Sequence, residues 1–235
     1  MLKSEDIRRG ARKLGFAACG ATRLHTVPDD VIARYDDWLA GGCAAGMDYM
    51  HRHRDIRRDP ALLMPGARSI VCLAMAYTPK TEVEGFAHYA YGHDYHDVVR
   101  ERATGLALRL LGKTAVPNTD FRVCVDTAPI IERYWAAECG LGWIGRNHQL
   151  IIPDAGSEFF LCEILLADNV DHYDSPIASR CGTCRKCIEA CPTKALRPDG
   201  QLDARLCNSY LTIEHRGAWT HHTPTPGRIY GCDDC

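Results

Sequence analysis

The sequence lacks the segments that carry a protein to or across a membrane. Its N-terminus, Met-Leu-Lys-Ser-Glu-Asp, has no apolar signal core, and no run of about 18 apolar residues could span a bilayer. A strong charge of one sign is also missing: the net charge is −2, so any binding of nucleic acid must come from a local patch. No phosphate-binding P-loop run is present, and no dinucleotide site is predicted. We expect a protein of the reducing cytoplasm that makes no membrane contact.

Cysteine, in contrast, is abundant, with 13 residues in a chain of 235. Four of them stand in the run Cys181-x2-Cys184-x2-Cys187-x3-Cys191-Pro192. This is the C-x2-C-x2-C-x3-C-P pattern with which bacterial ferredoxins hold a 4Fe–4S cluster through thiolates. A structural zinc site is the alternative, because the chain also contains two separate C-x2-C pairs. Their separation far exceeds the gap of about 15–20 residues that is usual in zinc ribbons. The pattern therefore favours iron–sulfur chemistry and electron transfer.

Three later cysteines indicate a second cluster. In two-cluster ferredoxins the fourth cysteine of one run ligates the other cluster, which divides the ligands into two sets. The complete set is Cys191, Cys207, Cys232 and Cys235, and the incomplete set is Cys181, Cys184 and Cys187. If the spacing repeats, the missing ligand should lie about four residues beyond Cys235. We therefore expect a C-terminally truncated sequence; the alternatives are a three-coordinate first cluster or one that borrows another thiol.

The other six cysteines lie in apolar or helical stretches, where small buried thiols are common. They are Cys19, Cys43, Cys72, Cys124, Cys139 and Cys162.

Patterns upstream of the cysteine run alternate between helix and strand. The expected helices run from Ser4, as a cap, to near Gly15; from about Asp29 to Leu39; from Asp94, as a cap, to Gly112; and from Thr127, with Pro129 in the first turn, to Gly140. The expected strands are Ser69–Tyr77, Phe121–Val125, and a pair formed by His148–Ile152 and Phe159–Leu166 across the Pro153–Ser157 turn. This alternation predicts an α+β or α/β fold. We expect an α/β cofactor- and substrate-binding domain over 1–170 and a small two-cluster ferredoxin domain over 171–235, joined by a polar linker at 171–176.

Asp126 is the first candidate for chemistry in the larger domain. It follows the strand Phe121–Val125, and α/β folds place reactive groups at such strand ends. The alternative is that Asp126 only caps the next helix. The glycines of Gly140-Leu-Gly-Trp-Ile-Gly145 permit close backbone approach to a large flat ligand, or they form only a series of tight turns. Because a ferredoxin module alone only conducts electrons, we expect a substrate or redox cofactor in this domain.

Segments along nearly the whole chain resemble the epoxyqueuosine reductases, a family of cobalamin-dependent iron–sulfur enzymes that act in the last queuosine step in tRNA. Besides the cysteine run, the matching segments are Gly46–Met50, Arg57–Pro60, Leu63–Ala67, Tyr91–His96, Cys124–Pro129, Gly140–Gly145, Gly156–Leu161, Ser209–Glu214 and Arg228–Cys235. The family pattern continues past Cys235 to a further cysteine and a helical-repeat region.

The resemblance implies that cobalamin lies between the two domains and that two 4Fe–4S clusters pass single electrons to its cobalt, the first lacking its fourth ligand here. The family's proton donor, which lets the epoxide oxygen leave as water, falls on Asp126. Cys124, two residues earlier on the same strand, faces the same side, and His96 is a further pocket candidate. The expected cobalamin contacts are Tyr49, Tyr89, Cys124, Asp126, His148 and Ser209.

The resemblance also implies that the substrate is tRNA, bound through its anticodon arm with the modified base splayed out of the loop. The expected tRNA-binding residues are Arg52, Arg54, Arg57, Arg58, Glu214 and Arg216. Basic side chains of this kind contact phosphates, although such a run is also typical of a solvated face. We expect a monomer and an external electron donor such as a flavodoxin or ferredoxin.

Two other functions remain open from the sequence. A reductive dehalogenase-like enzyme also pairs cobalamin with two clusters but acts on a small molecule. A ferredoxin-type electron carrier would need the cysteine domain only, and the large first domain argues against it.

Overall fold

The computed structural model describes residues 1–219 and 222–235 and is built around one four-stranded sheet. Its strand order is β1 (Ala18–Arg23), β2 (Ser69–Ala76), β6 (Phe159–Leu166) and β3 (Phe121–Cys124). All three pairings are antiparallel. Of the two classes that the sequence left open, α+β therefore describes this sheet.

The two central strands explain the apolar runs of the sequence. Strands β2 and β6 pair over eight residues, from Ser69 opposite Leu166 to Ala76 opposite Phe159. Both faces of the sheet are covered by helices, so β2 is buried over its first seven residues and needs a continuous apolar run rather than an alternating one. The predicted strand Ser69–Tyr77 is confirmed to within one residue.

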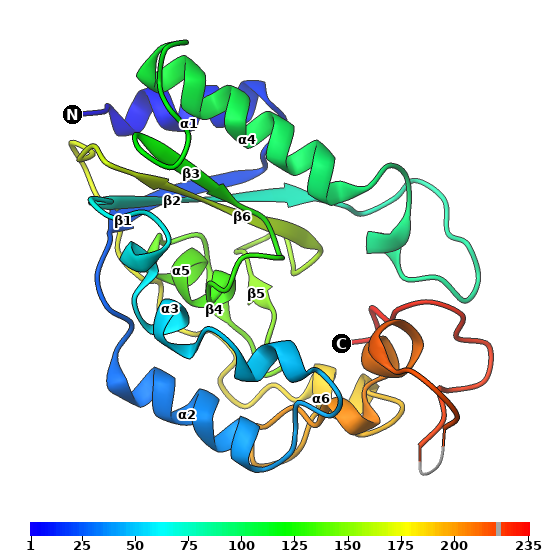
Figure 1. Cartoon of the computed structure of the whole chain (residues 1–235). Coiled ribbons are helices and arrows are strands. Elements are labelled where there is room, and N and C mark those ends of the chain that lie inside the picture. The colour runs from blue at the N-terminus through cyan, green and yellow to red at the C-terminus, as the bar shows by residue number, and fades with distance from the viewer. Residues whose placement is uncertain (220–221) are drawn as a thin grey trace.

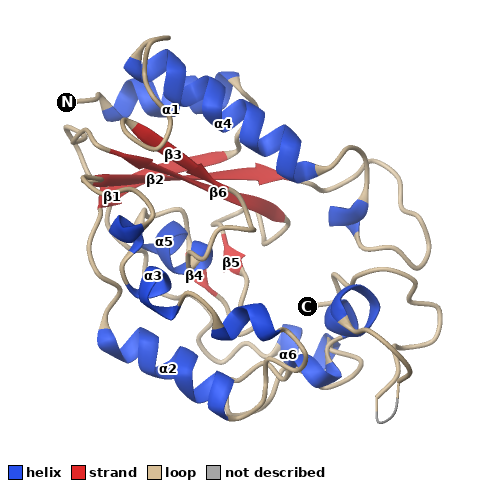
Figure 2. Cartoon of the chain, in the orientation of Figure 1, coloured by secondary structure: helices blue, strands red, loops and turns tan. Residues whose placement is uncertain are grey.

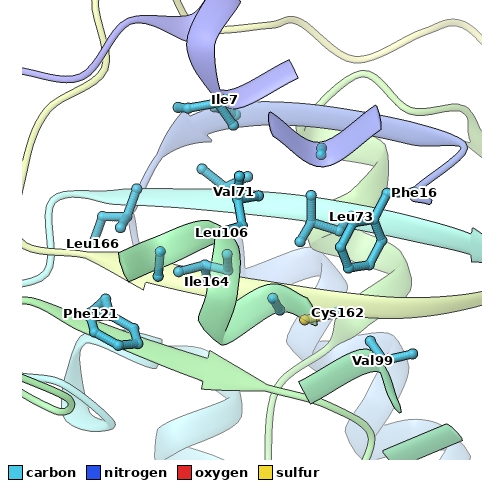
Figure 3. Close-up of a cluster of buried hydrophobic side chains, with 14 of the residues drawn as sticks. Ile7, Phe16, Val71, Leu73, Val99, Leu106, Phe121, Cys162, Ile164 and Leu166 are labelled. Carbon is cyan, nitrogen blue, oxygen red and sulfur yellow. The ribbon is translucent and has the colours of Figure 1, made fainter. Parts of the chain in front are cut away.

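Helices α1 (Ser4–Lys13) and α4 (Tyr95–Leu111) cover one face of the sheet (Figures 1 and 2). Ile7, Leu106 and Ile164 belong to the apolar cluster between these helices and the strands (Figure 3). Helix α4 begins as predicted, because the Asp94 side chain accepts the backbone N–H of His96 at 2.8 Å. The predicted cap at Ser4 is wrong: its backbone N–H donates to Asp171 Oδ1 at 2.8 Å, which ties the helix start to a distant loop.

Helices α2 (Asp29–Ala40), α3 (Arg54–Arg58) and α5 (Glu132–Glu138) lie on the other face (Figure 2). The fully buried Trp135 of α5 packs in a second apolar cluster there, with Ile70 and Leu165 of the sheet. Helix α5 starts at Glu132, later than the predicted start at Thr127, because residues 126–131 form an irregular turn.

The predicted pairing of His148–Ile152 with Phe159–Leu166 is wrong. Strand β5 (Leu150–Ile151) pairs instead with β4 (Trp143–Ile144) in a separate two-stranded sheet. Strand β6 enters the main sheet between β2 and β3, where its apolar side chains are covered on both faces.

The C-terminal part has little regular structure and a small apolar core of its own around Ile188 and Leu196. Its elements are α6 (Lys186–Ala190), η4 (Ala204–Leu206) and the π-helix η5 (Tyr210–Glu214). Three further short helices, η1 (Asp48–His51), η2 (Pro60–Leu62) and η3 (His88–Ala90), belong to the first part. The Trp38 indole N–H donates to the Leu202 carbonyl at 2.6 Å and so joins the two parts. The domain boundary near residue 170 stays a prediction.

In the described residues, no helix has both the length and the apolar character that crossing a membrane requires.

Candidate active site

A cavity of about 970 Å³ is lined by side chains from both parts of the chain. The first part contributes Asp126, His96 and Phe160, and the C-terminal part contributes Ser209 and Leu196, among others. Small-molecule sites commonly measure about 300–1,000 Å³, so this cavity suits a large ligand. Among the expected cofactor contacts, Tyr89, Asp126 and Ser209 line it, whereas Tyr49, Cys124 and His148 do not.

Asp126 stands at the turn that follows β3, with a backbone φ of 52°. Its Oδ2 lies 3.1 Å from His96 Nε2, and the other ring nitrogen of His96 lies 2.7 Å from Asp94 Oδ1. Partial burial works to lower the pKa of His96, but its hydrogen bonds to the two carboxylates outweigh this and raise it. The alternative reading of Asp126 as a helix cap is not supported, because Ile131 stands at the N-cap of α5 and no side chain caps that helix. The two carboxylates therefore favour the protonated form of His96 next to Asp126.

Two further carboxyl groups lie behind Asp126. Glu132 Oε1 accepts the backbone N–H of Asp126 at 2.7 Å. Burial, together with the charge of Asp126, raises the pKa of Glu132 to about 7. Glu163 is fully buried on β6 without a hydrogen-bond partner in the described residues, and burial raises its pKa as well. Neither residue was predicted from the sequence; the usable signal for Glu163 was a single acidic residue within an apolar strand.

One tyrosine–serine pair joins the two parts at the cavity wall, and stacked aromatic rings of the first part lie on the same wall. The Tyr89 and Ser209 hydroxyls lie 3.0 Å apart, across the two parts of the chain. Burial raises the pKa of Tyr89 to about 12, so it stays a neutral phenol at physiological pH. Tyr95 stacks on Phe160 with ring centroids 4.1 Å apart and an interplanar angle of 2°. This wall offers flat apolar faces with a few hydroxyl groups between them.

The cluster cysteines fall into two groups. The first group is Cys191, Cys207, Cys232 and Cys235; burial raises the pKa of Cys235 to about 12, and the thiols of Cys207, Cys232, Cys191 and Cys187 add to this shift. All four members of the first group line the cavity. Here we name them the inner set.

The other three, Cys181, Cys184 and Cys187, do not line the cavity, and we name them the outer set. Burial and the thiols of Cys181 and Cys184 raise the pKa of Cys187, so these three are neighbours too. Cys184 is exposed to solvent. Within the described residues, no three His, Cys, Asp or Glu side chains gather closely enough to hold a single metal ion. Five of the six remaining cysteines are buried as predicted, and Cys19 is half-buried.

The glycine-rich run supports the cluster region rather than a flat ligand. A Cβ at Gly142 would strike the Ile151 backbone, so this glycine lets β4 pack on β5. The run has the spacing G-x-G-x-x-G, but it follows helix α5 and leads into a two-residue strand, which is not the strand-to-helix setting of a dinucleotide site. Beside it, the Trp143 indole N–H donates to Cys181 Sγ at 3.4 Å. Asn147 Nδ2 donates to the Cys235 carbonyl at 2.7 Å.

The predicted basic cluster is mostly engaged within the protein. Arg57 is buried and donates to the Tyr35 hydroxyl at 2.9 Å, so it is corrected from a phosphate contact to a packing residue. Arg54 pairs with Asp36, and Arg58 pairs with Asp29. Arg52 is exposed, and no ion pair holds it in the described part of the chain.

The two remaining tRNA candidates lie at the end of the π-helix η5. Glu214 lines the cavity and accepts a hydrogen bond from Tyr49 at 3.4 Å. Arg216 is exposed and donates to the Ile213 carbonyl at 2.6 Å.

Two family models match the chain. Residues 57–127 match the model described as epoxyqueuosine reductase QueG, DUF1730, and residues 180–235 match the 4Fe-4S double cluster binding domain. The second match covers all seven cysteines of the two sets.

Proteins named epoxyqueuosine reductase are similar over nearly the whole chain. One from Xanthomonas campestris is 41% identical over 97% of this chain and 67% of its own length. One from Leadbetterella byssophila is 37% identical over 99% of this chain and 77% of its own length.

Solved structures agree with these relatives. A crystal structure of epoxyqueuosine reductase with an epoxyqueuosine-modified tRNA-Tyr stem loop has a TM-score of 0.83 at 32% identity. A structure of the enzyme from Bacillus subtilis, with its catalytic aspartate loop swung out of the active site, has a TM-score of 0.80 at 32% identity. Both comparisons cover 98% of this chain, which spans 63% of the length of those two proteins. The chain belongs to the epoxyqueuosine reductase family.

Proposed function

We propose that this chain reduces the epoxide of epoxyqueuosine in tRNA to the alkene of queuosine. That conversion consumes two electrons and two protons and releases one water. The observation that carries the proposal is the cavity, which is lined both by the four thiols of the inner set and by the Asp126–His96 pair. An electron source and a proton source therefore face the same ligand space.

We propose cobalamin as the resident group of this cavity. The residues present fit it: the volume of about 970 Å³ is large, and Tyr89, Ser209 and Phe160 offer flat faces and hydroxyl groups at the wall. These residues and Leu196 would hold the corrin. When bound, cobalamin supplies one-electron chemistry at its cobalt.

Asp126 is proposed to give a proton to the departing oxygen. The pKa of His96 is raised by its two carboxylate neighbours, and its Nε2 lies 3.1 Å from Asp126 Oδ2, so His96 is placed to replace the proton that Asp126 loses. Glu132 holds the Asp126 turn through the backbone N–H. A proton donor that is reloaded in place serves catalysis near neutral pH.

The tRNA would present its modified base unstacked from the anticodon loop, since a base inside a stack cannot enter the cavity. Arg52 and Arg216 are the exposed candidates for phosphate contact. Location in the cytoplasm, a monomeric state and an external electron donor stay predictions.

The test is turnover by the chain after anaerobic loading with cobalamin, iron and sulfide. The substrate is an anticodon stem loop that carries epoxyqueuosine, dithionite is the reductant, and nucleoside mass spectrometry measures the product. We expect a nucleoside lighter by one oxygen. Absence of this product from protein that retains cobalamin, clusters and stem loop would overturn the proposal.

A further inference from the structure

The two cysteine sets differ in their position relative to the cavity. The inner set lines the cavity, so electrons that leave it reach the cavity ligand directly. The outer set lies away from the cavity, and its Cys184 is exposed. Cys235 of the inner set is exposed as well, but it lines the cavity, so another protein can approach the outer set without displacing the cavity ligand. The outer set therefore gives the protein an entry face, located at Cys181–Cys187.

Four cations surround this entry face. They are Arg146, Arg180, Arg185 and Lys186. Each is exposed, and in residues 1–219 and 222–235 none forms a salt bridge. Arg146 Nη2 donates to the Gly182 carbonyl at 2.9 Å, and the Arg180 guanidinium lies 5.8 Å from the Trp143 ring centroid. Both therefore lie against the outer set.

Cations without a salt bridge also occur elsewhere among the described residues, for example Arg52 and Arg216, but here four of them gather around one cysteine set. Three other cations of the C-terminal part are paired with carboxylates, in Arg197–Asp199, Arg205–Asp203 and Arg228–Asp234. The one acidic residue of helix α6 is Glu189, whose backbone carbonyl accepts Lys194 Nζ at 3.2 Å. The net charge of the whole chain is −2, so the positive charge at the entry face is local.

We propose that the basic face formed by Arg146, Arg180, Arg185 and Lys186 docks a small acidic one-electron carrier protein, which delivers electrons to the outer set. The inference rests on the proposed function, because that function needs a supply of electrons. Opposite charges speed encounter and orient the partners, while exposed pairs add little affinity, which suits a carrier that must leave after each transfer. Each visit oxidises the carrier by one electron and reduces the outer cluster by one. Two visits supply the two electrons of one epoxide reduction.

A nucleic acid is the competing occupant, since phosphates also bind arginines. The cavity, which would receive the modified base, is lined by none of these four cations. The basic face instead surrounds the exposed Cys184. Its position therefore favours a redox protein over the substrate.

The test measures binding first. The variant R185Q/K186Q removes two charges at the entry face. The matched control R109Q/K113Q removes one arginine and one lysine, both exposed, at the end of α4 on the opposite face of the sheet (Figure 1). Titration calorimetry follows binding of an oxidised flavodoxin with a strongly acidic surface, at low and high salt, to the cluster-loaded chain. Exposed pairs contribute about 0.2–1 kcal/mol each, so the affinity of R185Q/K186Q should fall by about 2- to 30-fold and depend less on salt. The control should bind as the wild type does.

A second measurement separates docking from effects on the cluster itself. Stopped-flow absorbance follows reduction of the iron–sulfur chromophore by reduced flavodoxin and, separately, by dithionite, which needs no docking face. Slower reduction by flavodoxin with an unchanged dithionite rate supports the proposal. Equal slowing with both reductants, or unaltered flavodoxin affinity, overturns it. Lower stem-loop affinity with normal flavodoxin binding assigns the face to nucleic acid and also overturns it. If R185Q/K186Q loses iron, the same measurements are made on R180Q, because Arg180 lies outside the cysteine run.

Neither measurement requires substrate turnover. Failure of the epoxide assay with normal flavodoxin docking would sink the proposed function alone. If R185Q/K186Q binds flavodoxin as the wild type does, while dithionite-driven turnover of the wild type is normal, this inference alone is overturned.

Discussion

Glu132 Oε1 accepts the backbone N–H of Asp126 at 2.7 Å, so one carboxylate holds the turn that presents another. Asp126 needs such a hold because its φ of 52° lies in the left-handed region, which is sparsely populated for residues other than glycine. The Asp126 side chain itself is 55% exposed toward the cavity, where His96 is its hydrogen-bond partner. A backbone held in place and a carboxyl group that reaches the cavity are what a positioned proton donor requires.

The first prediction tests the proton donor. Asp126→Asn keeps the size and a hydrogen bond to His96 but cannot give up a proton. We expect turnover to fall by about 10²- to 10⁴-fold, the usual contribution of general acid catalysis. Cobalamin absorbance and iron content should stay at wild-type levels. Turnover near that of the wild type would remove Asp126 from this role.

The second prediction concerns Glu132 and pH. Burial raises the pKa of Glu132 from its ordinary value of 4.5 to about 7 in the folded chain, so folding favours the protonated form. The stability that this protonated form provides is present below pH 4.5 and is lost as the pH rises through 7. Glu132→Gln cannot ionise and still accepts the Asp126 N–H. At pH 8 this variant should be more stable than the wild type by on the order of 1–3 kcal/mol, and the difference should shrink toward pH 5.

Chemical denaturation at pH 5 and pH 8 measures this difference. Glu101→Gln, an exposed position on α4, is the matched control and should show no such dependence. The charges that face Glu132 are Asp126 from the β3 turn, His96 from α4, Arg133 from α5 and Glu163 from β6. Equal stability of Glu132→Gln and the wild type at both pH values would mean that Glu132 is solvated rather than buried.

Local sequence patterns predicted the local structure well. They failed where contacts between distant segments determine the structure. The strand at 69–76 and the cap at Asp94 follow from an apolar run and from a side chain next to its helix. The partner of Phe159–Leu166 did not follow, because its neighbours β2 and β3 come from elsewhere in the chain. The same limit applies to the site. Asp126 stood at a recognisable strand end, whereas Glu132 gains its importance only from the turn that folds back on it.

The third prediction concerns the two cysteine sets. The inner set offers four thiolates, so it should hold an intact 4Fe–4S cluster in this chain. The outer set offers three, so its cluster should lose iron first on exposure to air. Iron analysis and electron paramagnetic resonance, before and after exposure, measure both. Cys235→Ala should destabilise the inner cluster, whereas Cys184→Ala should affect only the labile one. An iron content of about eight atoms per chain that is stable in air would contradict this prediction.

The fourth prediction separates two arginines that the sequence had grouped together. Arg52 is exposed, whereas Arg57 is buried and donates to the Tyr35 hydroxyl at 2.9 Å. If Arg52 contacts a phosphate, Arg52→Gln should weaken binding of the anticodon stem loop and lower the slope of log affinity against log salt by roughly 0.7–0.9. Its melting temperature should stay unchanged. Arg57→Gln should do the reverse, because it leaves the Tyr35 hydroxyl without its donor inside the fold. Its melting temperature should fall while the salt slope stays at the wild-type value. A salt slope that changes only in Arg57→Gln would show that this side chain leaves its buried position when tRNA binds.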